Sequence, residues 1–419
     1  MNPLSRDFAP PLHLIAPFFK FGVLFYLLSM LSLLFFSPDF TYAQMDIAGW
    51  VHLFLLGFVM MVIFGAMAQL IPVVLEVGHV VVDVYYVILP LLGVGVSMMV
   101  IGFWLLPQLL PYGGLLVLTA MIIFASENLL TLKKTKLKTL TVRTVAWSNG
   151  YLLLGILTGF SLALGFAGSL SIDIAMMLKA HVYAVLGGYV MLTIMGLSLT
   201  LIPMFSLAHG FDEKPIHQAF NLLILGVGVV FLGAFFSLEW LMYLGYTISF
   251  LGVSFYVWQI YIIAMLTVRK ELDVWAKSMI FAFGALIFSM LTGLVALVTG
   301  DTAMLHTAVW FFLLGFVSSM ITGHLYKIVP FLVWFERFSP LVGKEKVPML
   351  HEMYSKEGAS VMFNFTALGV ILGGFGLLFE SELLFKAGGS FLFAGSIFLW
   401  ITMQKMLSYG SELTQTKES

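Results

Sequence analysis

The chain has 419 residues, of which 61% are hydrophobic and only 10% are charged, and its mean hydropathy is +1.05. These values exclude a soluble globular domain of this length and indicate a polytopic membrane protein. The formal net charge of −1 gives no reason to expect nucleic-acid binding. The absence of cysteine excludes disulfides, iron–sulfur clusters and covalent attachment of haem.

A bilayer span needs about 20 mostly apolar residues, and the chain contains twelve such stretches. They are predicted at residues 16–36, 47–73, 80–105, 109–131, 146–167, 174–203, 217–236, 239–267, 275–298, 302–333, 358–379 and 382–408. Three prolines precede the first stretch and argue against a cleavable signal peptide, so we expect the first span to be retained. The sequence predicts an all-α membrane protein with a single transmembrane domain, residues 1–419.

The second, sixth and tenth predicted spans share the pattern Gly-x7-Gly-x6-Pro. Its members are Gly57, Gly65 and Pro72; Gly188, Gly196 and Pro203; and Gly315, Gly323 and Pro330. The first glycines lie 131 and 127 residues apart (188 − 57 and 315 − 188). The spacing predicts three pseudo-repeats of four helices, at approximately 16–131, 146–267 and 275–408.

Lysine and arginine in the short links predict the orientation of the spans. The basic links lie at 133–143, 269–277 and 337–356, and in a twelve-span weave all three fall on the same side as both termini. The links at 37–46, 168–173 and 299–301 on the other side contain no Lys or Arg. We therefore expect both termini in the cytoplasm and the protein in a bacterial inner membrane.

Each glycine–proline pattern follows a histidine, which lies 5, 7 or 9 residues before the first glycine: His52, His181 and His306. All three are expected about 6 to 10 Å below the outer surface, at 1.5 Å of rise per residue. One membrane histidine alone is adequately explained by a hydrogen bond to a neighbouring helix, with a gain of about 1 kcal/mol or less. Three at comparable depth instead favour a metal or haem site, because intramembrane polar groups are usually functional.

The other conspicuous residues have simpler interpretations. Glycines eight apart allow helices to pack closely, although a flat macrocycle between helices would also need close backbone approach. The prolines are expected to bend or end their helices. The remaining histidines in the amino-terminal segment and the cytoplasmic links are predicted to be solvated: His13, His79, His209, His217 and His351. His324 is placed in the membrane, in the inner half of the tenth span.

Together these features resemble the catalytic subunit of haem–copper oxidases, which has twelve helices, threefold pseudo-symmetry and histidines near the outer ends of helices 2, 6 and 10. The stretch Gly323-His324-Leu325-Tyr326 with Pro330 is similar to the tenth helix of C-family oxidases. The segment Gly49-Trp50-Val51-His52 resembles NnrS-type haem- and copper-containing membrane proteins.

The resemblance implies a non-covalent haem, of b type, with His52 and His306 as its axial ligands. His181 matches the copper ligand of the sixth oxidase helix, and Lys179 is placed to pair with a haem propionate. The implied partners, besides the lipid bilayer, are an electron donor or respiratory-complex subunits and a diatomic gas, oxygen or nitric oxide. The implied activity is electron transport or gas handling.

The chain departs from the oxidase pattern at the copper site. The oxidases need two adjacent histidines in the seventh helix for copper, but the seventh span here contains only His217, at its cytoplasmic end. They also need two ligands two residues apart in the tenth helix, one for each haem, but here Ala308 stands two residues after His306. A complete oxidase copper site is not expected, and the presence of copper stays open. We therefore expect His181 to be a weak ligand or a hydrogen-bond donor beside the haem.

Two other classes of function fit twelve spans. One is a membrane transporter, although carriers usually consist of two related halves and not three units. The other is a metal-free assembly subunit of a respiratory complex. The sequence leaves open whether the protein is an enzyme; the resemblance implies an oxidoreductase of haem–copper type if it is one.

Overall fold

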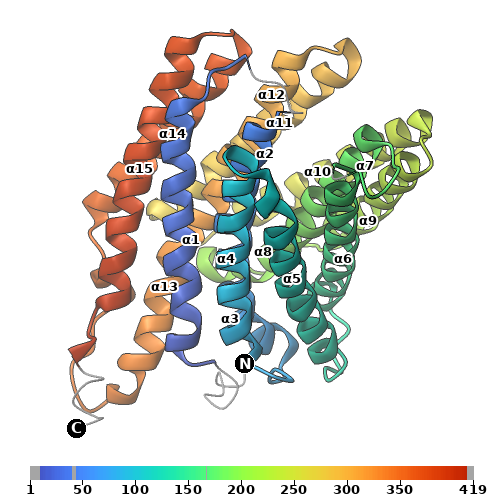
Figure 1. Cartoon of the computed structure of the whole chain (residues 1–419). Helices are drawn as coiled ribbons and strands as arrows, with labels where there is room; N and C mark the ends of the chain where they lie inside the picture. The colour runs from blue at the N-terminus through green and yellow to red at the C-terminus, as the bar shows by residue number, and fades with distance from the viewer. Residues whose placement is uncertain (1–9, 40–43, 167, 413–419) are drawn as a thin grey trace. The chain divides into compact units, whose positions relative to one another are not determined.

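The protein is described here by a computed structural model, which covers residues 10–39, 44–166 and 168–412 (Figure 1). These residues form helices and links and contain no strand. Twelve helical runs in them are long and apolar enough to cross a membrane. The twelve predicted spans are therefore confirmed, and every predicted boundary lies within six residues of the observed one.

Nine of the runs are α-helices, two of them extended by a turn of 3₁₀-helix. They are α1 (Leu12–Ser32) with η2 (Leu33–Phe35), α4 (Val84–Trp104), η4 (Pro107–Leu109) with α5 (Leu110–Leu132), α6 (Leu140–Phe166), α9 (Lys214–Phe235), α10 (Glu239–Met265), α11 (Val274–Thr299), α14 (Lys356–Leu378) and α15 (Glu382–Ser408). Two short 3₁₀ turns, η7 (Ser339–Leu341) and η8 (Leu350–Met353), lie in the link before α14.

The three spans with the glycine–proline pattern are built differently, because each changes from α-helix to π-helix and back. They are α2 (Met45–His52), η3 (Leu53–Met60) and α3 (Met61–Leu75); α7 (Ile174–Val182), η5 (Tyr183–Met191) and α8 (Leu192–Ser206); and α12 (Thr302–Trp310), η6 (Phe311–Val317) and α13 (Ser318–Arg337). In each, the π-helical segment contains the first glycine of the pattern. π-Helical insertions are rare and occur frequently at functional sites.

These three spans are also the most buried. In their most apolar windows 83%, 67% and 72% of the residues are buried, compared with 50% or less in the other nine spans. The prolines at the inner ends were expected to bend or end their helices; they lie inside the helices and do not end them, because α3 and α8 each continue for three residues beyond Pro72 and Pro203. In α13 the helix continues to Arg337.

The chain divides into two compact units, which we describe separately. Unit 1 comprises the described residues of 68–98 and 108–270, and unit 2 those of 10–67, 99–107 and 271–412. In unit 1, α9 and α10 form a close antiparallel pair (Figure 1). Their backbones approach so closely that a Cβ atom on Gly245 would lie 2.7 Å from the amide nitrogen of Val230. Small residues allow this kind of packing in membranes.

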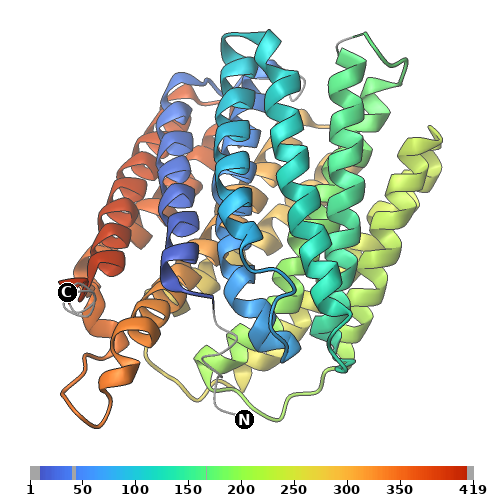
Figure 2. The ribbon, with the colours of Figure 1, turned by 60° about the horizontal axis from the view of Figure 1, so that its bottom comes forward.

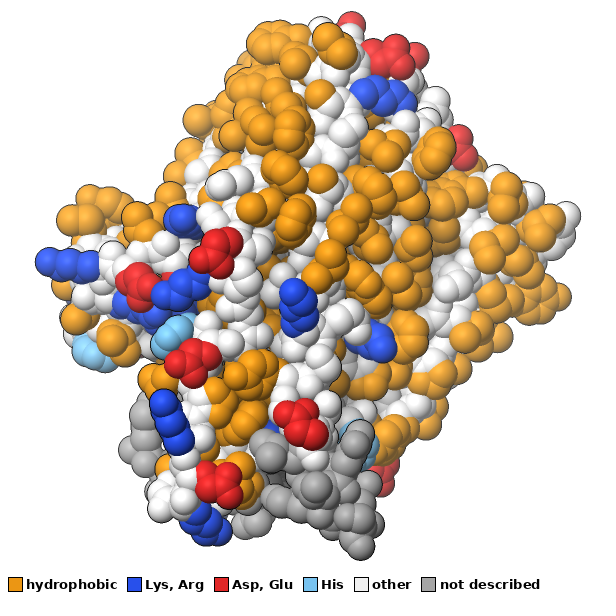
Figure 3. All heavy atoms as spheres, turned by 90° about the vertical axis from the view of Figure 1, so that its left-hand side faces the viewer, with side chains coloured by type: hydrophobic (Ala, Val, Ile, Leu, Met, Phe, Trp, Pro, Cys, Tyr) orange, Lys and Arg blue, Asp and Glu red, His pale blue; other side chains and the backbone are white. Residues whose placement is uncertain are grey.

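In unit 2, α14 and α15 form a similar pair, in which the backbones meet at Gly373 and Gly388. α1 lies beside α15, as the blue and red helices in Figure 2 show. Hydrophobic side chains cover much of the upper and right-hand part of the face drawn in Figure 3, while most Lys, Arg, Asp and Glu side chains lie in its lower and left-hand part. Continuous apolar surface of this kind fits helices that face lipid.

Candidate functional site

The six glycines of the pattern all contact the helix that precedes their own. A Cβ atom added to the first glycine would lie 2.7 Å from Phe25, 2.5 Å from Tyr151 or 2.6 Å from Ala285 in the three spans. One added to the second glycine would meet Phe18, Thr144 or Ser278. In each span the second contact residue lies seven positions before the first. The glycines therefore serve helix packing, and they do not leave a slot for a macrocycle.

A hydrogen bond recurs at the same place in these helix pairs. One partner lies seven positions before the first glycine of the pattern. The other lies on the preceding helix, four positions after the residue that this first glycine contacts (Phe25, Tyr151 or Ala285). The indole Nε1 of Trp50 donates to the carbonyl of Ser29 at 3.0 Å, and the imidazole Nδ1 of His181 contacts the carbonyl of Gly155 at 2.8 Å. In the third pair the direction reverses, and the hydroxyl of Ser289 donates to the carbonyl of Ala308 at 2.7 Å.

His181 thus occupies the position of Trp50, not that of His52 or His306. Its ring lies against α6, where a Cβ atom on Gly159 would be 2.8 Å from Cε1 of the imidazole. Because a backbone carbonyl only accepts hydrogen bonds, Nδ1 carries the proton, and Nε2 carries the lone pair in the neutral ring. The side chain is half-buried, in an interface between two helices of unit 1.

His52 is the last residue of α2, directly before the π-helix η3. Its Nδ1 lies 2.7 Å from the carbonyl of Ala48, and its ring stacks on Phe103 at a centroid distance of 5.0 Å. The next residue, Trp104, donates its indole N–H to the carbonyl of Asp46 at 3.0 Å and so holds the end of α4 against α2. The Nδ1 contact again fixes the tautomer, with the lone pair of the neutral ring on Nε2.

His306 lies near the start of α12. The carboxylate of Asp301 caps this helix, accepting hydrogen bonds from the backbone N–H groups of Ala303 at 2.8 Å and Met304 at 3.2 Å. The imidazole is half-buried, and α12 packs against α11 and α14. His52 and His306 both belong to unit 2, whereas His181 belongs to unit 1.

Lys179, predicted beside a haem propionate, is exposed on α7. It stands nine positions before Gly188, the position that His306 has relative to Gly315. The position of His52, five before the first glycine, is taken by Tyr183 in the second pattern and by Trp310 in the third. The three histidines therefore have three different structural positions, although the sequence predicts a similar depth in the membrane for all of them.

Within the described residues, no group of three or more His, Cys, Asp or Glu side chains comes together in a way that could hold a metal ion. No protein-family model matches the chain, and no curated protein matches it. The case for any ligand therefore depends on the residues of this chain.

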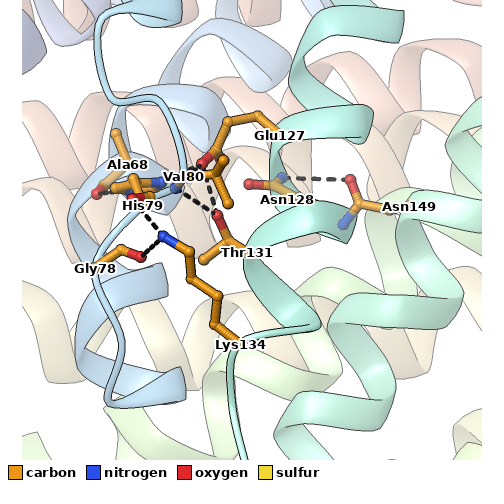
Figure 4. A network of polar contacts seen from close by, with 9 residues as sticks. All are labelled: Ala68, Gly78, His79, Val80, Glu127, Asn128, Thr131, Lys134 and Asn149. Carbon is orange, nitrogen blue, oxygen red and sulfur yellow. Dashed lines mark hydrogen bonds and ion pairs between the residues drawn. The ribbon is translucent and has the colours of Figure 1, made fainter.

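Sequence reasoning missed a buried polar cluster in unit 1 (Figure 4). His79, predicted to be solvated in a link, has a side chain that is only 2% exposed, so that prediction is wrong. Its Nδ1 lies 3.0 Å from Oε1 of Glu127, and its Nε2 lies 2.7 Å from the carbonyl of Ala68. The next residue of α5, Asn128, donates its amide to Asn149 of α6 at 3.3 Å.

A second buried ion pair lies in unit 2. Nζ of Lys327 is 2.6 Å from Oδ2 of Asp273, and both side chains are 14% exposed. The same ammonium group lies 5.8 Å from the centre of the Trp275 ring, whose indole N–H faces Nε2 of His324 at 3.4 Å. This cluster ties the start of α11 to α13.

Proposed function

We propose that the protein binds haem within the membrane and handles electrons or a diatomic gas, as a member of the haem–copper oxidase and NnrS group. The observation that carries the proposal is the contact of His52 Nδ1 with the carbonyl of Ala48. Histidines that bind metals generally donate their other ring N–H to a carbonyl or a carboxylate, which fixes the ring and raises its basicity. His52 already has this second-nitrogen contact within its own helix.

His306 is the second proposed ligand. It belongs to the same unit as His52, on a helix whose start is fixed by the Asp301 cap. Two neutral imidazoles are a donor set that fits haem iron, and haem bound in this way supplies a one-electron redox centre. The glycines of the pattern add no support, because neighbouring helices already fill the space beside them.

The three buried spans support the proposed threefold relation. Each contains a π-helix around the first glycine, and each packs its two glycines against residues seven apart on the preceding helix. An interhelical hydrogen bond recurs seven positions before the first glycine. Packing detail of this kind goes beyond what twelve apolar helices need, and it favours three copies of one ancestral four-helix unit over the two related halves usual in transporters.

In this proposal His181 and Lys179 are not axial ligands. His181 holds α7 against α6 through the contact of its Nδ1 with the carbonyl of Gly155. Lys179, being exposed, contributes positive charge near the end of α7. The seventh span lacks the pair of adjacent histidines that an oxidase copper site needs, so no step is assigned to copper.

Haem content of purified variants tests the proposal. We expect one haem per chain in the wild type and less than a tenth of that amount in His52→Ala and in His306→Ala. His351→Ala, in an exposed link, is the matched control and should keep its haem. Full haem content in both ligand variants would contradict the assignment.

A further inference from the structure

We propose that Glu127 and His79 form a proton-binding site in unit 1, with Oε2 of Glu127 as the atom that takes up the proton. The site is independent of the haem proposal, because its residues belong to α4, α5 and the α3–α4 link of unit 1.

A chain reversal after α3 places His79 beside α5. α3 ends at Leu75, and Glu76 has a φ of 53°, the left-handed conformation that reverses a chain at a helix end. The link then returns towards α5, where Nζ of Lys134 donates to the carbonyls of His79 at 3.0 Å and Gly78 at 3.3 Å. Residues 76–83 are thereby tied to α5, with the imidazole directed inwards (Figure 4).

The hydrogen bonds determine where protons lie. Nε2 of His79 faces the carbonyl of Ala68 and must carry a proton. Oε1 of Glu127 accepts from the hydroxyl of Thr131 at 2.7 Å and from the backbone N–H of Val80 at 3.2 Å, besides its contact with Nδ1 of His79. An oxygen that receives three hydrogen bonds does not itself carry a proton. Oε1 is therefore already fully occupied as an acceptor.

The other carboxylate oxygen is different. Oε2 is buried and, among the residues that the structure describes, it has no hydrogen-bond partner, although the Glu127 side chain is only 3% exposed. A buried charged oxygen in this situation costs free energy. Oε2 is thus the one position on the pair at which another proton can bind.

The groups around Oε2 select a proton over a metal ion. A metal ion needs several anionic or imidazole ligands, and no group of three or more such ligands occurs in the described part of the chain.

Proton uptake at Oε2 adds one positive charge to the His79–Glu127 pair. The other titratable groups beside the pair are Tyr85, which interacts electrostatically with Glu127, and Lys134, which donates to the carbonyl of His79. Neither is a carboxylate that could compensate the added charge, so protonation of Glu127 should become more favourable when negative charge arrives in unit 1.

Infrared difference spectra of the purified protein, recorded while the pH is lowered, test this site. We expect a protonated-carboxyl C=O band that shifts in heavy water and is lost in Glu127→Gln. Glutamine places a donor at the Oε2 position and keeps an acceptor at Oε1, so it imitates the protonated state. Glu239→Gln, an exposed carboxylate at the start of α10, is the matched control and should keep the band.

Thr131→Val gives a second, independent result, because it keeps the shape of the side chain and removes only the hydroxyl. Loss of the donor to Oε1 should favour the protonated carboxyl about tenfold, which moves the midpoint of the band up by about one pH unit. An unchanged carboxyl band in Glu127→Gln would overturn the proposal and leave a permanently ionised structural pair. An unchanged midpoint in Thr131→Val would overturn it as well, even if Glu127→Gln does not fold.

Discussion

Replacing Gly159 by alanine tests whether the imidazole of His181 packs on α6 as a helix clamp. The new Cβ would lie 2.8 Å from Cε1 of His181, well inside van der Waals contact, so the ring must move. Overpacking of this kind costs about 1–3 kcal/mol. The movement also strains the 2.8 Å hydrogen bond from Nδ1 to Gly155, and an interhelical bond in a membrane contributes about 0.6–1.7 kcal/mol.

A double-mutant cycle isolates this contact. In a His181→Ala background the clash is absent, so Gly159→Ala should cost at least about 1 kcal/mol less there than in the wild type. The free energy of unfolding is measured by denaturant titration in micelles, with helix content from circular dichroism. Gly150→Ala is the matched control on α6, because a Cβ at that position meets nothing within 4 Å. A coupling energy below about 0.3 kcal/mol would refute the packing of His181 on α6.

Three further outcomes follow from the packing of the described helices. Trp50→Phe keeps the ring but loses the donor to Ser29, and thermal unfolding should show a loss of about 1 kcal/mol that the exposed Trp147→Phe does not show. Gly323→Val should be destabilising by more than about 1 kcal/mol, because its Cβ would lie 2.7 Å from that of Ser278; equal stability of the variant and the wild type would contradict the close helix contact. Lys327→Met leaves the carboxylate of Asp273 buried without its ion-pair partner and should cost about 3 kcal/mol, whereas Lys214→Met, whose side chain is 87% exposed, should cost less than about 1 kcal/mol in the same titration.

The twelve helices could be predicted because a bilayer span is a matter of length and hydropathy, and both are visible in a single sequence. The π-helical segments could not. Spans such as residues 45–75 are largely apolar around the whole helix, so their sequence has no polar–apolar periodicity. The wider turn of a π-helix would be visible only as a change in such a periodicity. The first glycine of each pattern was visible, but glycine alone does not distinguish a π-helix from a tight helix contact.

The histidines show where sequence reasoning about the site stops. Spacing from the glycines gave the three histidines three different offsets, yet it did not reveal that His181 shares its position with Trp50. The angles expected from ideal α-helices also do not apply between His52 and Gly57, because the chain is π-helical from Leu53 onwards. His79 and Glu127 are 48 residues apart. Only the chain reversal at Glu76 brings them together, and no sequence pattern predicted it.

The optical spectrum of the purified protein, recorded oxidised and then reduced, tests the central claim most directly. A haem held by His52 and His306 is six-coordinate and low-spin, so the reduced protein should show a Soret band with sharp α and β bands. Both sharp bands should disappear when either histidine is replaced by alanine, and they should persist in His181→Ala. A protein that folds and carries no Soret absorption, or one that keeps the low-spin bands in both ligand variants, would contradict the account.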